Sequence, residues 1–289
     1  VKKHRIVILP SLFTLGNALC GFAAITFTTR AFIGEPDVIG FGDITIAGGF
    51  IFLAMGLDAI DGRLARMARA TSDFGGQLDS LSDAISFGIA PAFLMHRIVV
   101  QSLGASGWVN MLILRTAWIC AAIYVGSVLI RLARFNVENV HDEEAHAHFR
   151  GLPTPPAAGL MTALVIVLNT FWQTEVHEVA GHVMVCSLPV VGAVLGILMV
   201  SRIRYVHLVN YVLKGKRPIG HFVNIVFAVA FLSLLFVLSP QITTAVGFGL
   251  FVVSGPLQTA YRKLWKKDFA DLEAVSTEGN WSDNSDLQE

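Results

Sequence analysis

The chain has 289 residues, a mean hydropathy of +0.63 and only 15% charged residues, a composition that excludes an ordinary soluble domain. Its 21 basic and 21 acidic residues cancel to a formal charge of zero, so the net charge gives no reason to expect a nucleic-acid partner. Several apolar runs exceed about 18 residues, the length that predicts a membrane-spanning helix. We therefore expect an all-α integral membrane protein.

Eight stretches of the chain are predicted to span the membrane. They are residues 6–29, 43–64, 80–101, 108–132, 155–173, 180–201, 219–239 and 241–261. The basic start and the apolar run after it look like a signal peptide. The run from Ile6 to Phe27 is long, however, and no small-x-small site follows it, so we expect a retained first helix. The membrane domain is predicted over residues 1–265, with a disordered, acidic, cytoplasmic tail over residues 266–289.

Basic residues fall almost entirely in alternate loops of this eight-span arrangement. They lie at both ends of the chain and in the loops after the second, fourth and sixth spans, whereas the opposite loops keep only Arg30. Positively charged loops stay in the cytoplasm. The asymmetry therefore predicts that both termini and the segment from Asp58 to Asp83 face the cytoplasm.

Four aspartates lie at the predicted junction between the second and third spans. Asp58 and Asp61 are three residues apart and share one face of a helix. Asp79 and Asp83, four residues apart, share a face of the next helix. If the helices are antiparallel, the four carboxylates converge and need cations to neutralise them, and hard oxygen ligands suit Mg²⁺, Mn²⁺ or Ca²⁺. The alternative, a solvated hairpin with ordinary surface carboxylates, explains poorly why acids interrupt apolar helices.

Small and basic residues surround these acids. Gly62 and Ala65 keep the helix surface low, which lets a bulky phosphate group approach. Arg66 and Arg69 supply positive charge for the phosphate oxygens. Two metal ions with a phosphate between them are typical of a phosphoryl-transfer centre, so we expect this chemistry at the junction.

The spacing of these residues also has a specific match. The pattern is D-x-x-D-G-x-x-A-R, eight residues, G, three residues, D, three residues, D, and its fixed positions are Asp58, Asp61, Gly62, Ala65, Arg66, Gly75, Asp79 and Asp83. It resembles the signature of the CDP-alcohol phosphatidyltransferases. The resemblance implies a six-helix catalytic core that transfers a phosphatidyl group from CDP-diacylglycerol to an alcohol and releases CMP. It also implies two Mg²⁺ or Mn²⁺ ions, a bacterial inner-membrane location and, as is common in the family, a homodimer.

The resemblance assigns a role to each acid and to four further residues. Asp58, Asp61 and Asp79 are expected to hold the two ions. Asp83 is expected to contribute to the second ion and to act as the catalytic base that takes the proton from the acceptor hydroxyl. The residues expected to bind the CDP-alcohol are Thr14, Gly62, Arg66 and Ser72.

The first span contains a polar run that fits the family only in part. The family often has P-N-x-x-T at this point, whereas this chain has Ser11 in place of the asparagine and keeps Thr14. Thr14 is therefore the expected contact to the CDP-alcohol. The alternative is that Ser11, Thr14 and Asn17 only form hydrogen bonds between helices, and the sequence leaves both interpretations open.

Two segments after the fourth span resemble the family members that make phosphatidylserine. They are residues 131–137 (RLARFNV) and 151–156 (GLPTPP). Arg131 and Arg134 share a helix face, and this guanidinium pair is expected to bind the carboxylate of L-serine or a substrate phosphate. The alternative is that both side chains anchor the helix end at the membrane surface.

Other assignments stay open at this point. Glycerol 3-phosphate, inositol or choline would suit the same acidic signature as acceptors. A transporter with acids along an ion path is disfavoured, because the acids gather at one membrane face and no charged series crosses the midplane. The loop 141–148 (HDEEAHAH) is expected to be solvated, and Arg97 and Arg115 need partners that the sequence does not identify.

Overall fold

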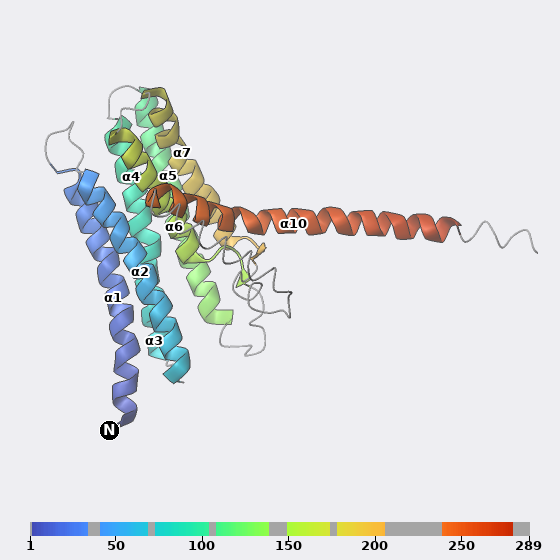
Figure 1. Ribbon diagram of the computed structural model, residues 1–289, viewed down its shortest axis with the longest axis horizontal. Helices are drawn as coiled ribbons and strands as arrows, with labels where there is room; N and C mark the ends of the chain where they lie inside the picture. The colour runs from blue at the N-terminus through green and yellow to red at the C-terminus, as the bar shows by residue number, and fades with distance from the viewer. Residues whose placement is uncertain are drawn as a thin grey trace, which may run out of the picture.

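The structure is a computed structural model, and the residues that it describes are 2–33, 41–68, 73–103, 108–138, 149–173, 178–205 and 239–279. Long helices form a bundle (Figure 1). In the first half they are α1 (Lys2–Arg30), α2 (Phe41–Ala68), α3 (Asp73–Asp83), the π-helix η1 (Ala84–Ile89) and α4 (Ala90–Leu103). In the second half they are α5 (Trp108–Glu138), α6 (Thr154–Gln173), α7 (Glu178–Val200) and α10 (Pro240–Gly279). The predicted all-α class is confirmed.

Seven helical stretches among the described residues are long and apolar enough to cross a membrane. They are Ser11–Arg30, Gly42–Leu64, Phe74–Leu103, Trp108–Val137, Thr154–Phe171, Gly181–Val200 and Pro240–Tyr261. Each corresponds to a predicted span, and the remaining prediction, at residues 219–239, lies outside the described residues except for residue 239. The third stretch begins earlier than predicted because α3, η1 and α4 follow one another without a break.

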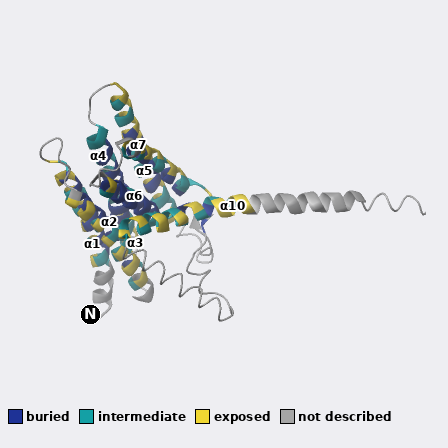
Figure 2. Cartoon of the chain, turned by 45° about the horizontal axis from the view of Figure 1, so that its top comes forward, coloured by how far each residue is buried: buried dark blue, intermediate teal, exposed yellow. Residues whose placement is uncertain are grey.

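The centre of the bundle is formed largely by α4 and α6. Buried residues make up 67% of the apolar window in Phe74–Leu103 and 72% of that in Thr154–Phe171, but only 28% of that in Trp108–Val137. Leu94 of α4 and Met161 of α6 are among the fully buried side chains. Figure 2 shows the buried residues inside the bundle and the exposed residues on its outer faces. Apolar side chains on those outer faces suit contact with lipid rather than water.

A short antiparallel strand pair closes the end of the bundle at which α6 begins. The strands are β1 (Phe149–Arg150) and β2 (Arg204–Tyr205). Gly151 follows β1 with a φ of +84°, and a Cβ atom there would lie 2.3 Å from the carbonyl oxygen of Met199. Only glycine fits this backbone conformation and this space. Its N–H donates to the carbonyl oxygen of Ile203 at 2.8 Å, which fixes the turn that leads into α6.

The helix α10 packs on the bundle through aromatic rings. The ring of Phe248 lies so close to Gly159 of α6 that a Cβ atom there would be 2.6 Å from it. The Tyr205 hydroxyl of β2 donates to the carbonyl oxygen of Val252 at 3.1 Å. Burial raises the pKa of Tyr205 to about 12, so the hydroxyl keeps the proton that this hydrogen bond needs.

The same helix extends further than predicted. In Figure 1 it runs away from the bundle, and it includes residues 266–279, which we expected to be disordered. Residues 280–289 lie outside the described part of the chain. The division between a membrane domain and a tail at residue 265 stays a prediction.

Candidate active site

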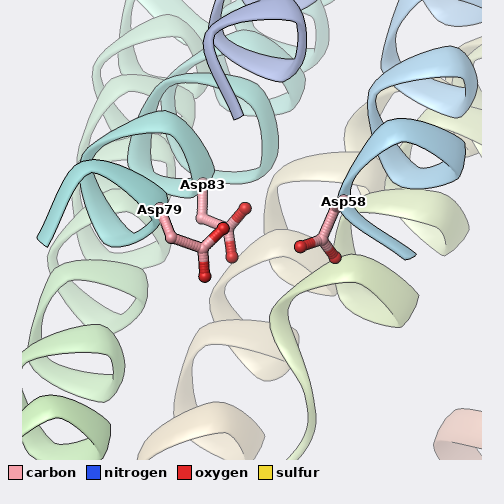
Figure 3. A group of neighbouring side chains, drawn as sticks. All are labelled: Asp58, Asp79 and Asp83. Atoms are coloured by element: carbon pink, nitrogen blue, oxygen red, sulfur yellow. The ribbon is translucent and has the colours of Figure 1, made fainter. Parts of the chain in front are cut away.

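Three of the predicted metal ligands meet where α2 and α3 approach each other. Asp58 belongs to α2, and Asp79 and Asp83 belong to α3. Each offers one carboxylate oxygen, and these three oxygens lie within 4.8 Å of one another. Figure 3 shows the side chains of Asp79 and Asp83 directed toward Asp58 on the neighbouring helix. Asp83 is buried and the other two are half-buried, so the helices bring the charges together at the edge of the protein interior.

The helix that carries two of these acids changes its winding directly after them. Asp79 and Asp83 lie about one α-helical turn apart, and the π-helix η1 begins at the next residue. The fully buried Tyr124 of α5 donates its hydroxyl to the η1 carbonyl oxygen of Phe87 at 2.9 Å. Isolated π-helical turns are rare and often occur at functional sites. The sequence pattern did not predict this one.

Asp61, the fourth acid of the motif, lies outside the group of three. Its carboxylate accepts a hydrogen bond from the hydroxyl of Thr14 on α1. Asp61 is three residues from Asp58 on the same face of α2, so it lies next to the group of three. The role of Thr14 as a CDP-alcohol contact stays a prediction, and the structure adds this second contact to it.

A second residue of α1 contacts the acids directly. Asn17 is fully buried, and its Nδ2 donates to Oδ1 of Asp83 at 3.0 Å. Thr14 and Asn17 are three residues apart and lie on one helix face. The hydrogen bonds between helices that we considered for both residues are therefore present. The sequence did not identify the acids as their partners, and the only signal was polar spacing within an apolar helix.

The last turns of α5 lie beside the acid-bearing turn of α3. The hydroxyl of Ser80 donates to Oδ1 of Asn136 at 3.0 Å. Arg134 donates from Nη1 to the carbonyl oxygen of Val200 at 3.3 Å, which ties α5 to α7 and agrees with an anchoring role. Arg131 is half-buried on the same stretch. Binding of an acceptor group by the two arginines stays a prediction.

The other predicted contacts to the CDP-alcohol are described only in part. Gly62 is half-buried on α2, next to Asp61. Arg66 belongs to the same helix, but its side chain is outside the described part of the structure. Ser72 and the loop 141–148 are outside it altogether.

Arg97 and Arg115, for which the sequence identified no partners, differ in their surroundings. The guanidinium carbon of Arg97 lies 5.1 Å from the centroid of the Phe32 ring, a cation–π contact between α4 and the segment after α1. Arg97 therefore has an aromatic partner, while its Nε is buried without a hydrogen-bond partner among the described residues. Arg115 is exposed on the outer face of α5.

The donor set of the acid cluster fits a hard divalent cation. Three carboxylates this close repel one another, and a cation between them relieves the repulsion. The group contains oxygen ligands alone, without the histidine or cysteine that zinc sites prefer. Mg²⁺ and Mn²⁺ suit such a set. Asp58, Asp79 and Asp83 are therefore the residues that would hold an ion.

Comparison with known proteins agrees with this geometry. The model of the CDP-alcohol phosphatidyltransferase family matches residues 7–201, a range that includes all four acids and their partners on α1. The chain belongs to this family. Proteins named CDP-diacylglycerol–serine O-phosphatidyltransferase are similar to it along much of their length.

Relatives of this name from three organisms give the extent of the similarity. The protein of this name from Helicobacter pylori is 30% identical over 253 residues, which cover 87% of this chain and 91% of the relative. The one from Bacillus subtilis is 30% identical and covers 69% and 90% of the two chains. The one from Methanocaldococcus jannaschii is 31% identical and covers 70% and 75%.

Proposed function

We propose that this family member transfers the phosphatidyl group of CDP-diacylglycerol to the hydroxyl of L-serine, producing phosphatidylserine and CMP. The observation that carries the proposal is the group of Asp58, Asp79 and Asp83, with three carboxylate oxygens within 4.8 Å. The names of the relatives support serine as the acceptor. Acids placed between membrane helices suit a reaction in which one substrate is a lipid and the other is water-soluble.

The acid cluster is proposed to hold two divalent ions, Mg²⁺ or Mn²⁺. Asp58, Asp61 and Asp79 are the proposed ligands, and Asp83 contributes to the second site. When bound, the ions neutralise the diphosphate of CDP-diacylglycerol and stabilise the departing CMP.

Asp83 is proposed to act as the catalytic base. Its carboxylate accepts the proton of the serine hydroxyl while the hydroxyl oxygen attacks the phosphorus atom on the diacylglycerol side of the diphosphate. A phosphorus–oxygen bond to serine forms, and the bond from the same phosphorus to the bridging oxygen breaks. The electron pair of that bond leaves with CMP, and Asp83 later returns the proton to water.

Residues near the acids are proposed to position the nucleotide. Gly62, beside Asp61, leaves the surface of α2 low where the diphosphate approaches. Arg66 supplies positive charge to the phosphate oxygens, and Thr14 and Ser72 complete the proposed contacts to the CDP-alcohol.

Arg131 and Arg134 are proposed to bind the carboxylate of L-serine or a substrate phosphate. The hydrogen bond between Ser80 and Asn136 supports this placement, because it joins the end of α5 to the turn of α3 that carries the acids. Guanidinium groups bind carboxylate and phosphate in two-point geometry, which makes arginine suited to the task.

The proposed location is the inner membrane of a bacterium, with both termini and the acid cluster at the cytoplasmic face. The distribution of Lys and Arg among the loops supports this orientation. L-serine and the cytidine nucleotide would then reach the acids from the cytoplasm, while CDP-diacylglycerol would enter from the bilayer. A homodimer is part of the proposal because dimers are common in the family.

The test is release of CMP by purified protein supplied with CDP-diacylglycerol, Mn²⁺ or Mg²⁺, and L-serine. Asp83→Asn is measured in parallel. Asp43→Asn is the matched control, because it makes the same chemical change on α2 where Asp43 pairs with Arg30 at 3.3 Å. We expect release that depends on serine and on the metal, persists in Asp43→Asn and disappears in Asp83→Asn.

Different outcomes separate the parts of this proposal. Release with glycerol 3-phosphate, inositol or choline but not with serine would reassign the acceptor and keep the mechanism. Full activity of Asp83→Asn would remove Asp83 from the catalytic step. If folded protein releases no CMP with any alcohol, the proposed transferase activity is wrong.

A further inference from the structure

The helix α1 provides a donor to each of the two acid-bearing helices. Thr14 donates to Asp61 on α2, and Asn17 donates to Asp83 on α3. Asp61 and Asp83 are both buried, so water competes only weakly for either acceptor. The contact of Asn17 is the more informative one, because Asp83 belongs to the group of three acids and Asp61 does not.

Asn17 is connected to Asp83 by a second route through the backbone. The hydroxyl of Ser86, in the π-helix that follows Asp83, donates to the carbonyl oxygen of Asn17 at 2.7 Å. One turn further along α1, a Cβ atom on Gly21 would lie 2.8 Å from the Cα of Ser86, so the two backbones are in close contact. Side chain and backbone of Asn17 thus contact both Asp83 and the segment that carries it.

The carboxylate of Asp83 determines the orientation of the Asn17 amide. An ionised carboxylate can only accept hydrogen bonds, so the amide must present its NH₂ group to Asp83. This leaves Oδ1 of Asn17 buried, without a hydrogen-bond partner among the described residues. An asparagine that served only to join helices would be expected to use both ends of its amide. Here the interaction with Asp83 takes precedence.

We propose that Asn17 is a positioning residue for Asp83. Its NH₂ group holds Oδ1 of Asp83 in one place, and the second oxygen takes no part in that bond. The carboxylate is thereby fixed in the rotamer that faces Asp58 and Asp79. The inference rests on the proposed function for its effect on turnover, but the effect on metal binding does not depend on the identity of the acceptor alcohol.

The first measurement is the affinity of the purified full-length chain for Mn²⁺, followed by the electron paramagnetic resonance signal of the free ion. Asn17→Leu keeps a similar side-chain size and removes the donor. Loss of an outer-shell partner typically lowers metal affinity or activity about 10- to 100-fold, and we expect a decrease in this range for both Mn²⁺ affinity and kcat. The KM for the acceptor alcohol should change little.

The control is Thr162→Val, another isosteric change of a fully buried polar residue. Thr162 lies on α6 and faces Gly48, ten residues before Asp58 along α2, which corresponds to about 15 Å of helix. This variant should keep both Mn²⁺ affinity and kcat. If Asn17→Leu does not give folded protein, Asn17→Ser replaces it, because serine fits the space and is too short to reach Asp83.

A double-mutant cycle separates positioning from simple helix packing. In an Asp83→Ala background, Asn17→Leu should lower Mn²⁺ affinity no further, because the carboxylate that Asn17 positions is absent. A structural role would instead give the same additional loss in both backgrounds, and that result would overturn the proposal. Unchanged Mn²⁺ affinity in folded Asn17→Leu would overturn it as well. Neither result depends on CMP release, so a failure of the proposed function would be recognised separately.

Discussion

Two close helix contacts in this protein both depend on a glycine, but they differ in what the glycine faces. A Cβ atom on Gly21 of α1 would lie 2.5 Å from the hydroxyl oxygen and 2.8 Å from the Cα of Ser86 in η1. A Cβ atom on Gly48 of α2 would lie 2.5 Å from Cδ1 of Ile166 in α6. In the first contact, an added methyl group would meet the backbone of Ser86, which can move only together with the rest of its helix. The second is against the tip of a flexible side chain.

The chemistry of the two contacts differs in the same way. Around Gly21, directional hydrogen bonds join Ser86 to the Asn17 backbone and Asn17 to Asp83. Around Gly48 the neighbours are apolar apart from Thr162, whose hydroxyl has no partner among the described residues. The α1–η1 contact therefore fixes the geometry of the acids, whereas the α2–α6 contact supplies packing. Substitutions at the first should change activity, and substitutions at the second should change only stability.

The largest effect is expected when the acids themselves are changed. Asp79→Asn and Asp58→Asn each remove a negative charge and one of two carboxylate oxygens from a member of the group of three. Activity and Mn²⁺ affinity should fall by more than the roughly 10- to 100-fold typical of outer-shell partners. CMP release and Mn²⁺ titration measure both, with Asp43→Asn as control. Wild-type Mn²⁺ affinity in either variant would show that the cluster is not the metal site.

The next effect is expected from Gly21→Ala, which inserts a methyl group against the backbone of Ser86. Overpacking typically costs about 1–3 kcal/mol, and the better helix propensity of alanine offsets roughly 1 kcal/mol of this. The thermal unfolding midpoint in detergent should fall. Because the shift displaces the segment after Asp83, kcat should also fall, by up to about 100-fold for a displacement near 1 Å. Unchanged activity despite lower stability would mean that the α1–η1 contact does not position the acids.

The sequence predicted the acid end of the molecule well, because spacing alone determines which face of a helix a residue occupies. The separations of Asp58 from Asp61 and of Asp79 from Asp83 placed each pair on one face of its own helix, and the structure brings three of the four into one group. Hydropathy likewise predicted the seven apolar helices that the structure describes. Both signals are local in the sequence.

The features that were missed depend on contacts between distant segments. The partner of Asp61 is Thr14, and that of Asp83 is Asn17, 66 residues away in the chain. The π-helix after Asp83 has no sequence signature of its own and is accompanied by contacts from Ser86 and Tyr124 to other helices. These features depend on tertiary packing, so they cannot be predicted from the sequence pattern of each helix taken separately.

A smaller effect is expected at the second contact, from Gly48→Ala. The added methyl group meets Cδ1 of Ile166, which can rotate away. Cγ1 of Ile166 and Cγ2 of Thr162, each 3.1 Å from the added Cβ atom, leave little further space. The gain in helix propensity of roughly 1 kcal/mol offsets part of the strain. Gly49→Ala is the matched control, since no atom lies within 4 Å of its Cβ position. Activity should be retained in both, and a large loss in Gly48→Ala alone would give the α2–α6 contact a role in positioning Asp58.

The smallest effect, and the one opposite in sign, is expected from Thr162→Val. An unsatisfied buried hydroxyl typically costs about 1–3 kcal/mol, and valine replaces it with a methyl group of similar size. The unfolding midpoint should therefore stay the same or rise, with CMP release unchanged. A fall in the midpoint would show that the hydroxyl has a partner in the membrane, such as a buried water. A fall in activity without a change in stability would contradict the assignment of the α2–α6 contact to packing alone.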